Sequence, residues 1–269
     1  MTAVTDGLAT AATTRAGKRT GPGAARRRER WTAAVFLAPD LLGLLIFLVL
    51  PMVLCVVLGF FRVDGLGRYD FIGFDNYVRM VSDPQFWSSL RVTLVYIVFL
   101  VPLVFIVSLV LALLVKQKIP LVGLFRTVYF LPYMISLVVV GLLWKFMLAD
   151  DGGIIPSALH AVGVPAPSFL GQPGYALASV VVMGIWVYAG YYMVIFLAGL
   201  QEIPKDYYEA ARMDGAGVWR SFRVITWPLL KPTSFFVLLT LTITAVTGGF
   251  DLIFVLTRGG PAGGTSLLS

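Results

Sequence analysis

Few side chains in this sequence could carry out catalysis or bind a metal ion. The chain contains one histidine, His160, and one cysteine, Cys55. A single cysteine excludes an internal disulfide, and most nucleophilic and metal chemistry needs more of these residues. The long apolar segments hold only two carboxylates, Asp40 and Asp251, and the sequence lacks the Gly-x4-Gly-Lys-Ser/Thr loop that binds nucleotide phosphates. We therefore expect no enzymatic activity, no metal and no bound cofactor; any ATP would be hydrolysed by a partner.

A polar segment, residues 201–231, lies between two long apolar segments. Pro204 suits the first turn of a helix, where its missing N–H loses no partner, and Asp206 and Glu209 suit the positive end of the helix dipole. Gly215 can adopt the left-handed conformation of a C-terminal cap. The sequence therefore predicts a short charged helix that ends at this glycine.

A second short helix is expected from about Val218, ending at Pro228. Its spacing places apolar and basic side chains on opposite faces, with Trp219, Phe222 and Ile225 or Thr226 on one and Arg220 and Arg223 on the other. Such a helical hairpin could simply lie on the bilayer surface, or it could bind a partner protein.

The elements around this hairpin are expected to cross a membrane. Hydrophobic residues make up 58% of the chain and charged residues only 13%, far from the balance of soluble domains. Several apolar stretches exceed the roughly 20 residues that a spanning helix needs. We expect an all-α, polytopic bundle with five spans, at about 33–61, 92–115, 127–149, 175–200 and 232–257.

Charge places the N-terminus and the hairpin on the cytoplasmic side. Residues 1–30 are interpreted as a disordered basic tail, and residues 31–269 as the transmembrane domain. A basic tail can bind nucleic acid, but one that directly precedes a span is better explained as a cytoplasmic anchor, so no nucleic-acid partner is expected. Residues 116–126 and the hairpin are also basic, whereas Asp150 and Asp151 mark the opposite side.

The hairpin resembles the EAA loop of bacterial ABC importer permeases. The resemblance is carried by Glu209-Ala210-Ala211, by Gly215 four residues later, and by Ile225 and Pro228. Trp227 stands where the family usually has Leu. In that family the loop docks into a groove on a cytoplasmic ATPase dimer, which implies that the coupling residues are Glu209, Ala210, Ala211, Asp214, Gly215, Ile225 and Pro228.

Further segments are similar to sugar permeases of the maltose-transporter type. They occur in the family's order: Ala34–Gly43, Phe71–Tyr77, Asp83–Trp87, Phe125–Pro132, Trp144-Lys145 and Leu197–Pro204. The resemblance implies a second permease subunit, an extracytoplasmic sugar-binding protein and a sugar, or a polyol or its phosphate, as cargo. In the family a segment similar to Thr257–Pro261 leads into a sixth span, so the chain is expected to be truncated before that span, or to lack it naturally.

A sugar path requires hydrogen-bonding groups and aromatic faces near the middle of the membrane. The candidates are Tyr188, Tyr191, Tyr192, Thr247, Phe250 and Asp251, with Trp186 and Thr244 nearby. For each aromatic residue, packing alone is the favoured alternative to cargo contact. Asp251 could face a cavity, act at a gate, lie near the outer surface or pair with Lys145.

The competing hypothesis is a self-contained secondary transporter or channel. Such a protein is expected to show internal repeats and charge networks within the membrane, and neither is visible in this sequence. A membrane-embedded enzyme is a weaker alternative because the catalytic groups are missing.

Overall fold

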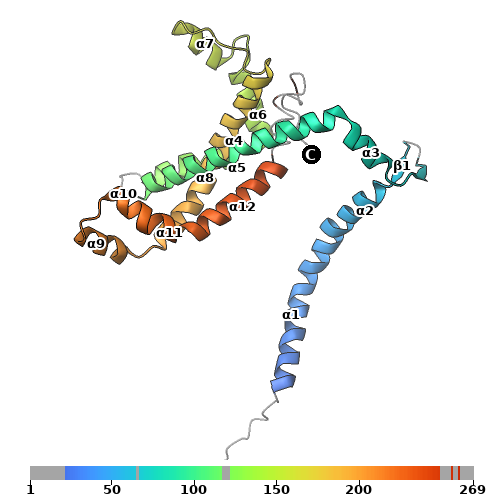
Figure 1. The fold of residues 1–269 in the computed structure, drawn as a ribbon, viewed down its shortest axis with the longest axis horizontal. Helices are drawn as coiled ribbons and strands as arrows, with labels where there is room; N and C mark the ends of the chain where they lie inside the picture. The colour runs from blue at the N-terminus through green and yellow to red at the C-terminus, as the bar shows by residue number, and fades with distance from the viewer. Residues whose placement is uncertain (1–21, 65–66, 117–121, 249–255, 257–259, 261–269) are drawn as a thin grey trace, which may run out of the picture. The chain divides into compact units, whose positions relative to one another are not determined.

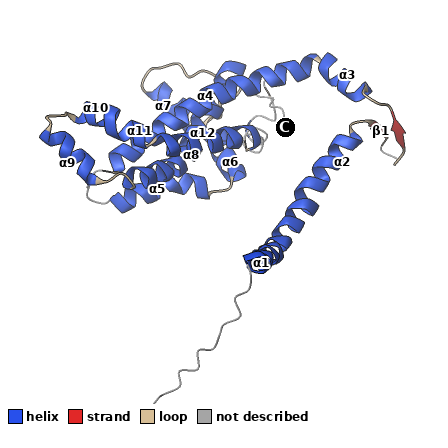
Figure 2. Ribbon diagram, turned by 60° about the horizontal axis from the view of Figure 1, so that its bottom comes forward, coloured by secondary structure: helices blue, strands red, loops and turns tan. Residues whose placement is uncertain are grey.

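A computed structural model describes residues 22–64, 67–116, 122–248, 256 and 260 (Figure 1). The chain divides into two compact units, Met1–Arg79 and Met80–Ser269, which are described in turn. The described residues are almost entirely helical, and the expected all-α class is confirmed. Within the described residues, the regular secondary structure that is not helical is a small pair of strands in the first unit (Figure 2).

The first unit contains a long helical segment. It comprises α1 (Pro22–Leu44), the π-helical turn η1 (Leu45–Val49) and α2 (Leu50–Leu58). Residues Trp31–Leu58 are long and apolar enough to cross a membrane, and none of the side chains in their most apolar stretch is buried. A helix that is apolar on every side is typical of a membrane span. This helix confirms the first predicted span.

The prediction for the basic tail was partly wrong, because α1 already begins at Pro22. Residues 22–30 are mostly Ala, Arg and Glu, which favour helix, and no breaker separates them from the span. They therefore extend the spanning helix. Residues 1–21 lie outside the described part of the chain.

A short β-hairpin and a short helix follow α2. Strand β1 (Phe61–Val63) pairs antiparallel with β2 (Tyr69–Phe71), and α3 (Asp75–Ser82) follows. The Asn76 amide donates hydrogen bonds to the carbonyls of Gly59 and Phe61, at 2.9 and 3.0 Å. Since those carbonyls lie just beyond α2, Asn76 fixes the path by which the chain leaves the helix.

The second unit is built from helices that pack around one pair. Its helices after α3 are α4 (Pro84–Val115), α5 (Val122–Met134), α6 (Leu137–Met147), α7 (Ile154–Ala161), α8 (Pro173–Gln201), α9 (Lys205–Met213), α10 (Val218–Ser221), the π-helical η2 (Phe222–Thr226), α11 (Trp227–Leu229) and α12 (Lys231–Thr247). Helices α4 and α8 pack side by side, and α5 and α12 lie against them (Figures 1 and 2).

Small residues allow this pair to approach closely. The Ser108 hydroxyl of α4 donates a hydrogen bond of 3.0 Å to the Ala189 carbonyl of α8. A Cβ at Gly184 would lie only 2.7 Å from the Leu100 side chain. Small residues are typical of helix contacts inside membranes, because close backbones gain dispersion energy that lipid does not replace.

Helices α4 and α8 confirm the second and fourth predicted spans, and both are long and apolar enough to cross a membrane. Helix α4 begins earlier than the predicted residue 92. The Asp83 carboxylate caps it by accepting a hydrogen bond of 2.8 Å from the Gln85 N–H, and Pro84 occupies its first turn. Hydropathy detected only the apolar part of this helix.

The third predicted span, residues 127–149, is broken rather than continuous. Helices α5 and α6 meet at a bend of 97°, with Ile135 and Ser136 between them. Pro132 lies in the last turn of α5 and lacks the N–H that would continue the hydrogen-bond ladder. The break leaves α5 free to pack along α8.

Helix α12 covers the fifth predicted span, 232–257, as far as Thr247. Residues Val218–Leu229 and α12 meet at a bend of 66°. Leu256 is helical and buried, whereas residues 249–255 lie outside the described part of the chain. Among the described residues, three helices are long enough to span alone, and five spans result if each bent pair counts as one.

Replacing Gly190 by Ala is expected to lower the stability of the protein by about 1–3 kcal/mol. The added methyl would meet the backbone carbonyl of Tyr129, which cannot rotate aside as a side chain could. Thermal unfolding of the full chain in detergent measures the effect. The matched control is Gly174→Ala in the same helix, where nothing lies within 4 Å of a new Cβ. Equal unfolding midpoints for the two variants would contradict the close approach of α5 to α8.

Candidate coupling interface and cargo path

The polar segment 201–231 folds as the predicted helical hairpin. Helix α9 ends where Gly215 adopts φ +73°. The Ala216 N–H donates to the Ala211 carbonyl at 2.8 Å, and the Gly215 N–H donates to the Arg212 carbonyl at 3.0 Å. These two bonds form a Schellman cap, which requires the left-handed conformation that glycine adopts at least cost. The predicted helix end at Gly215 is confirmed.

The second arm of the hairpin is the helical segment Val218–Leu229. It begins at Val218 as predicted, but it does not end at Pro228. The chain takes a π-helical turn, η2, and the Trp227 N–H bonds to the Phe222 carbonyl five residues back. A proline has no backbone N–H to donate to the carbonyl four residues back, and inside an α-helix its ring collides with that carbonyl. The wider turn accommodates that conflict, so the helix passes through Pro228. The same device precedes Pro51, where the Leu50 N–H bonds to the Leu45 carbonyl.

The π turn also changes which side chains share a face. Trp219 and Phe222 stack, with ring centroids 5.6 Å apart, as their predicted common face requires. However, Trp219 is 73% exposed whereas Thr226 is buried. The extra residue in the turn rotates the following side chains, and Thr226 points into the protein. Arg220 and Arg223 are exposed.

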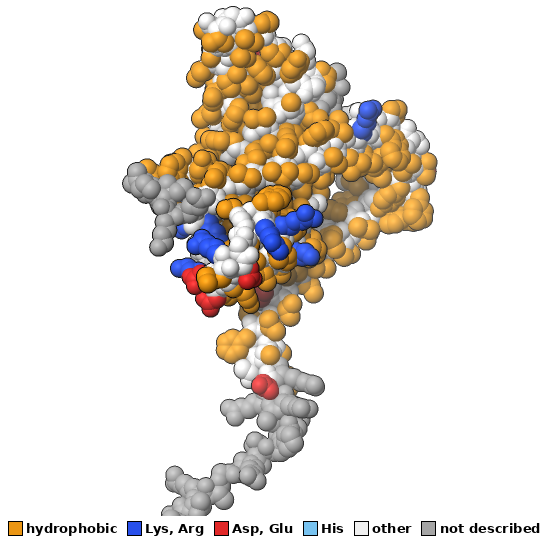
Figure 3. Space-filling model, turned by 60° about the vertical axis from the view of Figure 1, so that its left-hand side comes forward, with side chains coloured by type: hydrophobic (Ala, Val, Ile, Leu, Met, Phe, Trp, Pro, Cys, Tyr) orange, Lys and Arg blue, Asp and Glu red, His pale blue; other side chains and the backbone are white. Residues whose placement is uncertain are grey.

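Three of the predicted coupling residues line one hollow of about 140 Å³ between α9 and the second arm: Ala211, Asp214 and Ile225. Ala216, Arg220, Ser221 and Val224 complete its lining. The other predicted residues, Glu209, Ala210, Gly215 and Pro228, are exposed but do not line the hollow. Figure 3, with the α9 end forward, shows charged side chains gathered on a surface that is otherwise mostly hydrophobic.

Two apolar side chains beside the bend were not predicted. Met213 and Val218 are 89% and 90% exposed, although both are hydrophobic. Their position on either side of Gly215 was visible in the sequence, but their exposure depends on how the bend directs them.

A polar contact ties the hairpin to the end of α4. Lys116, the C-terminal cap of α4, donates a hydrogen bond of 3.1 Å from its Nζ to the Tyr208 hydroxyl. Its ammonium also lies 4.4 Å from the centre of the Tyr208 ring. The same hydroxyl shares a hydrogen bond of 2.9 Å with the buried Thr226 hydroxyl. Sequence reasoning missed Lys116 and Tyr208, because about 90 residues separate them.

The structure gathers the predicted tyrosines of α8 into one cluster. The Tyr191 ring stacks on Tyr133 of α5, with centroids 4.3 Å apart and planes at 15°. Tyr188 lies 6.4 Å from the Tyr133 ring, and Tyr192 makes an edge contact with Tyr191 at 5.0 Å. The Tyr192 hydroxyl shares a hydrogen bond of 3.1 Å with Thr244 of α12. Tyr133 was missed, because the break after α5 is what brings it to this site.

The remaining cargo candidates divide into three cases. Thr247 is described but donates to its own helix, to the Ile243 carbonyl at 2.9 Å. Trp186 lies beside Trp144, with ring centroids 6.0 Å apart, outside the tyrosine cluster. Phe250 and Asp251 lie outside the described residues, so the suggested pairing of Asp251 with Lys145 stays a prediction.

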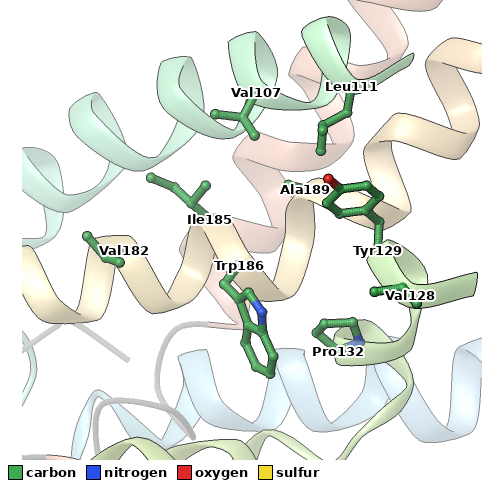
Figure 4. A pocket seen from close by; sticks show the side chains of 10 residues that line it. Val107, Leu111, Val128, Tyr129, Pro132, Val182, Ile185, Trp186 and Ala189 are labelled. Carbon is green, nitrogen blue, oxygen red and sulfur yellow. The ribbon is translucent and has the colours of Figure 1, made fainter. Parts of the chain in front are cut away.

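A separate apolar cavity of about 410 Å³ lies between α4, α5 and α8 (Figure 4). Its lining is almost entirely aliphatic and aromatic: Val107, Leu111, Val128, Tyr129, Pro132, Val182, Ile185, Trp186, Ala189 and Gly190. Sugars need several hydrogen-bonding groups, which this lining does not offer. The tyrosine cluster is therefore the better candidate for a sugar path.

Comparison with known proteins agrees with this arrangement. Residues 105–269 match the family described as binding-protein-dependent transport system inner membrane component. The lactose transport system permease protein of Rhizobium radiobacter is 35% identical over 240 residues, covering 87% of this chain and 80% of the relative. The trehalose/maltose transport system permease protein of Thermococcus litoralis is 33% identical over 243 residues, covering 90% and 82%.

Among solved structures, a bacterial ABC transporter involved in the import of the acidic polysaccharide alginate is similar in both fold and sequence. The TM-score is 0.77 at 27% identity, and the match covers 90% of this chain and 82% of that chain. Because both the family match and the relatives extend over most of the sequence, this multi-pass membrane protein belongs to the family of inner membrane components of binding-protein-dependent transport systems.

Proposed function

We propose that this chain is a transmembrane permease subunit of an ATP-driven ABC importer for a sugar or a related polyol. The observation that carries the proposal is the hairpin 201–231, which is polar and exposed yet anchored at both ends in apolar helices. A hairpin that only lay on the bilayer would need neither a glycine-capped bend nor a hollow between its two arms. A partner ATPase dimer would move the helices by closing on the hairpin, giving alternating access.

The choice of cargo rests on the relatives. Those named above transport lactose or trehalose and maltose, and the alginate importer was solved with a periplasmic protein that holds an alginate pentasaccharide. A saccharide path needs polar groups and aromatic side chains close together, and the tyrosine cluster with Thr244 brings both to one place between α5, α8 and α12. A soluble binding protein and a second permease subunit are the further proposed partners.

The proposed orientation places the N-terminus and the hairpin in the cytoplasm. Four arginines precede Trp31 in α1, and Lys and Arg occur throughout the hairpin, whereas Asp150 and Asp151 follow α6. Cytoplasmic loops carry the excess of basic residues in membrane proteins. This side is also where an ATPase and its ATP would be available.

Uptake into vesicles tests the function directly. The chain is reconstituted with its partner permease, ATPase and binding protein, and lactose, maltose, trehalose and an alginate oligosaccharide are supplied in turn. We expect uptake of at least one saccharide only when ATP is present on the hairpin side, because this chain lacks the loop that binds nucleotide phosphates. Uptake driven by an ion gradient without ATPase would instead support a secondary transporter.

The bend of the hairpin gives a second test. Gly215→Ala is expected to cost about 1–2 kcal/mol in the left-handed conformation and to misdirect α9, which lowers ATPase co-purification and ATP-driven uptake. The control is Gly217→Ala, since Gly217 has φ −71°, which Ala adopts freely, and both glycines have open space around them. Glu209→Lys should weaken ATPase binding with the fold intact. Normal co-purification and uptake in both Gly215→Ala and Glu209→Lys would contradict the coupling role.

The aromatic cluster gives a third test. Tyr191→Leu removes the ring that stacks on Tyr133, and we expect uptake at low saccharide concentration to fall about 10-fold, consistent with the loss of an aromatic contact of about 1.5 kcal/mol. Tyr175→Leu, an exposed tyrosine near the start of the same helix, is the control. Equal concentration dependence of uptake in the two variants would exclude Tyr191 from the cargo path.

A further inference from the structure

Hydrogen bonds of the Tyr208 hydroxyl bring together three elements, α9, α4 and η2. It lies on α9, accepts a hydrogen bond from Lys116 at the end of α4, and shares another with Thr226 in η2. Lys116 has no acceptor group, so it must be the donor, and the phenol proton remains available for Thr226. One phenol therefore satisfies both neighbours at once.

This contact differs from the rest of the attachment of the hairpin. Along the chain, α9 follows α8 and leads through Gly215 into the second arm, which continues into α12. At the base, the side chains of Ile203 and Leu230 are buried in the core and hold those two connections. The second arm is linked to α4 indirectly, because α12 packs on α4. Among the described residues, Lys116 provides a polar contact from α4 to the hairpin.

The physical character of the contact makes it suitable for transmitting motion. The bond from Lys116 is charge-assisted, and its ammonium also lies over the Tyr208 ring, so both the position and the tilt of the ring are fixed. Thr226 is 4% exposed, so its hydroxyl cannot exchange this bond for water without opening the core. Tyr208 also directly precedes Glu209, the first residue of the proposed ATPase contact.

We propose that Lys116, Tyr208 and Thr226 form a latch that passes movement of α9 directly to α4. The inference rests on the proposed function and deepens it: these three are positioning residues, which transmit the closure of the ATPase without forming its docking surface. When α9 is displaced, the latch makes α4 follow as part of the same rigid body. Without these contacts, α9 can tilt about its two ends, at Pro204 and Gly215, while α4 remains in place.

The central variant is Tyr208→Phe, which keeps the ring and its contact with the Lys116 ammonium but removes both hydrogen bonds. We expect ATPase co-purification and ATP turnover to persist. The number of saccharide molecules imported per ATP should fall about 10-fold, because one charge-assisted and one neutral hydrogen bond between α9 and its neighbours are lost. Thr226→Val, which conserves volume, should lower this ratio less, because the bond to Lys116 remains. The saccharide is the one that the wild-type complex imports.

The matched control is Tyr207→Phe, which removes a hydroxyl from the exposed neighbouring tyrosine of the same helix. It should import as many molecules per ATP as the wild type. The double variant Lys116→Met with Tyr208→Phe should import no more molecules per ATP than Tyr208→Phe alone, because it also loses the contact between the ammonium and the ring.

A distance measurement follows the latch without any cargo. Spin labels are placed at Leu114 on α4 and Lys205 on α9, both exposed, with Cys55 replaced by Ser in the complete complex. Trapping with ATP and vanadate should leave the distance between the labels unchanged in the wild type and change it in Tyr208→Phe.

The outcomes separate the latch from the proposed function. Equal import per ATP in Tyr208→Phe and Tyr207→Phe would overturn the latch, as would an unchanged distance in Tyr208→Phe. Loss of ATPase co-purification in Tyr208→Phe would also overturn it, since Tyr208 would then act in docking. A wild-type complex without ATP-dependent uptake would overturn the proposed function itself.

Discussion

The close packing of α4 against α8 is the contact on which the rest of the second unit depends. Inside a membrane, lipid is as apolar as the side chains, so helices associate through close contact and buried hydrogen bonds rather than through the hydrophobic effect. Gly184 and the bond between Ser108 and Ala189 supply both. Helix α5 then reaches the backbone of α8 at Gly190, and α12 approaches Gly199 through Thr233. The tyrosine cluster is built on this pair, together with α5 and α12.

The cluster of tyrosines shows how that packing creates a site. Tyr191 and Tyr192 are adjacent on α8, but one contacts Tyr133 of α5 and the other Thr244 of α12. The two contacts lie on different sides of α8, so the cluster exists only when three helices meet. Its tyrosine hydroxyls are held by the same packing that excludes lipid from the core. A change in the angle between these helices would alter the space between the aromatic rings.

The hairpin shows the opposite arrangement, in which local chain geometry dominates. The Schellman cap at Gly215 and the π turn before Pro228 are set by the backbone within a few residues. Together they direct α9 and the second arm so that a hollow opens between them, with Met213 and Val218 exposed beside it. A rigid hairpin can transmit a displacement, whereas a flexible loop would absorb it. Tyr208 and its two partners extend that rigidity to α4.

Composition and local sequence patterns were enough to predict the helical membrane class, the apolar segments and the helix end at Gly215. These properties follow from composition and from the conformations open to single residues, so no distant contact is needed to predict them. Hydropathy could not detect the bend after Pro132, because α5 and α6 are both apolar and a hydropathy profile does not register a change of helix direction. The helix through Pro228 was missed for a similar reason, since a π turn leaves no clear pattern in residue types. Only the tertiary structure brought Tyr133 to Tyr191 and Lys116 to Tyr208, because those contacts join residues far apart in the chain and form only once the helices have packed.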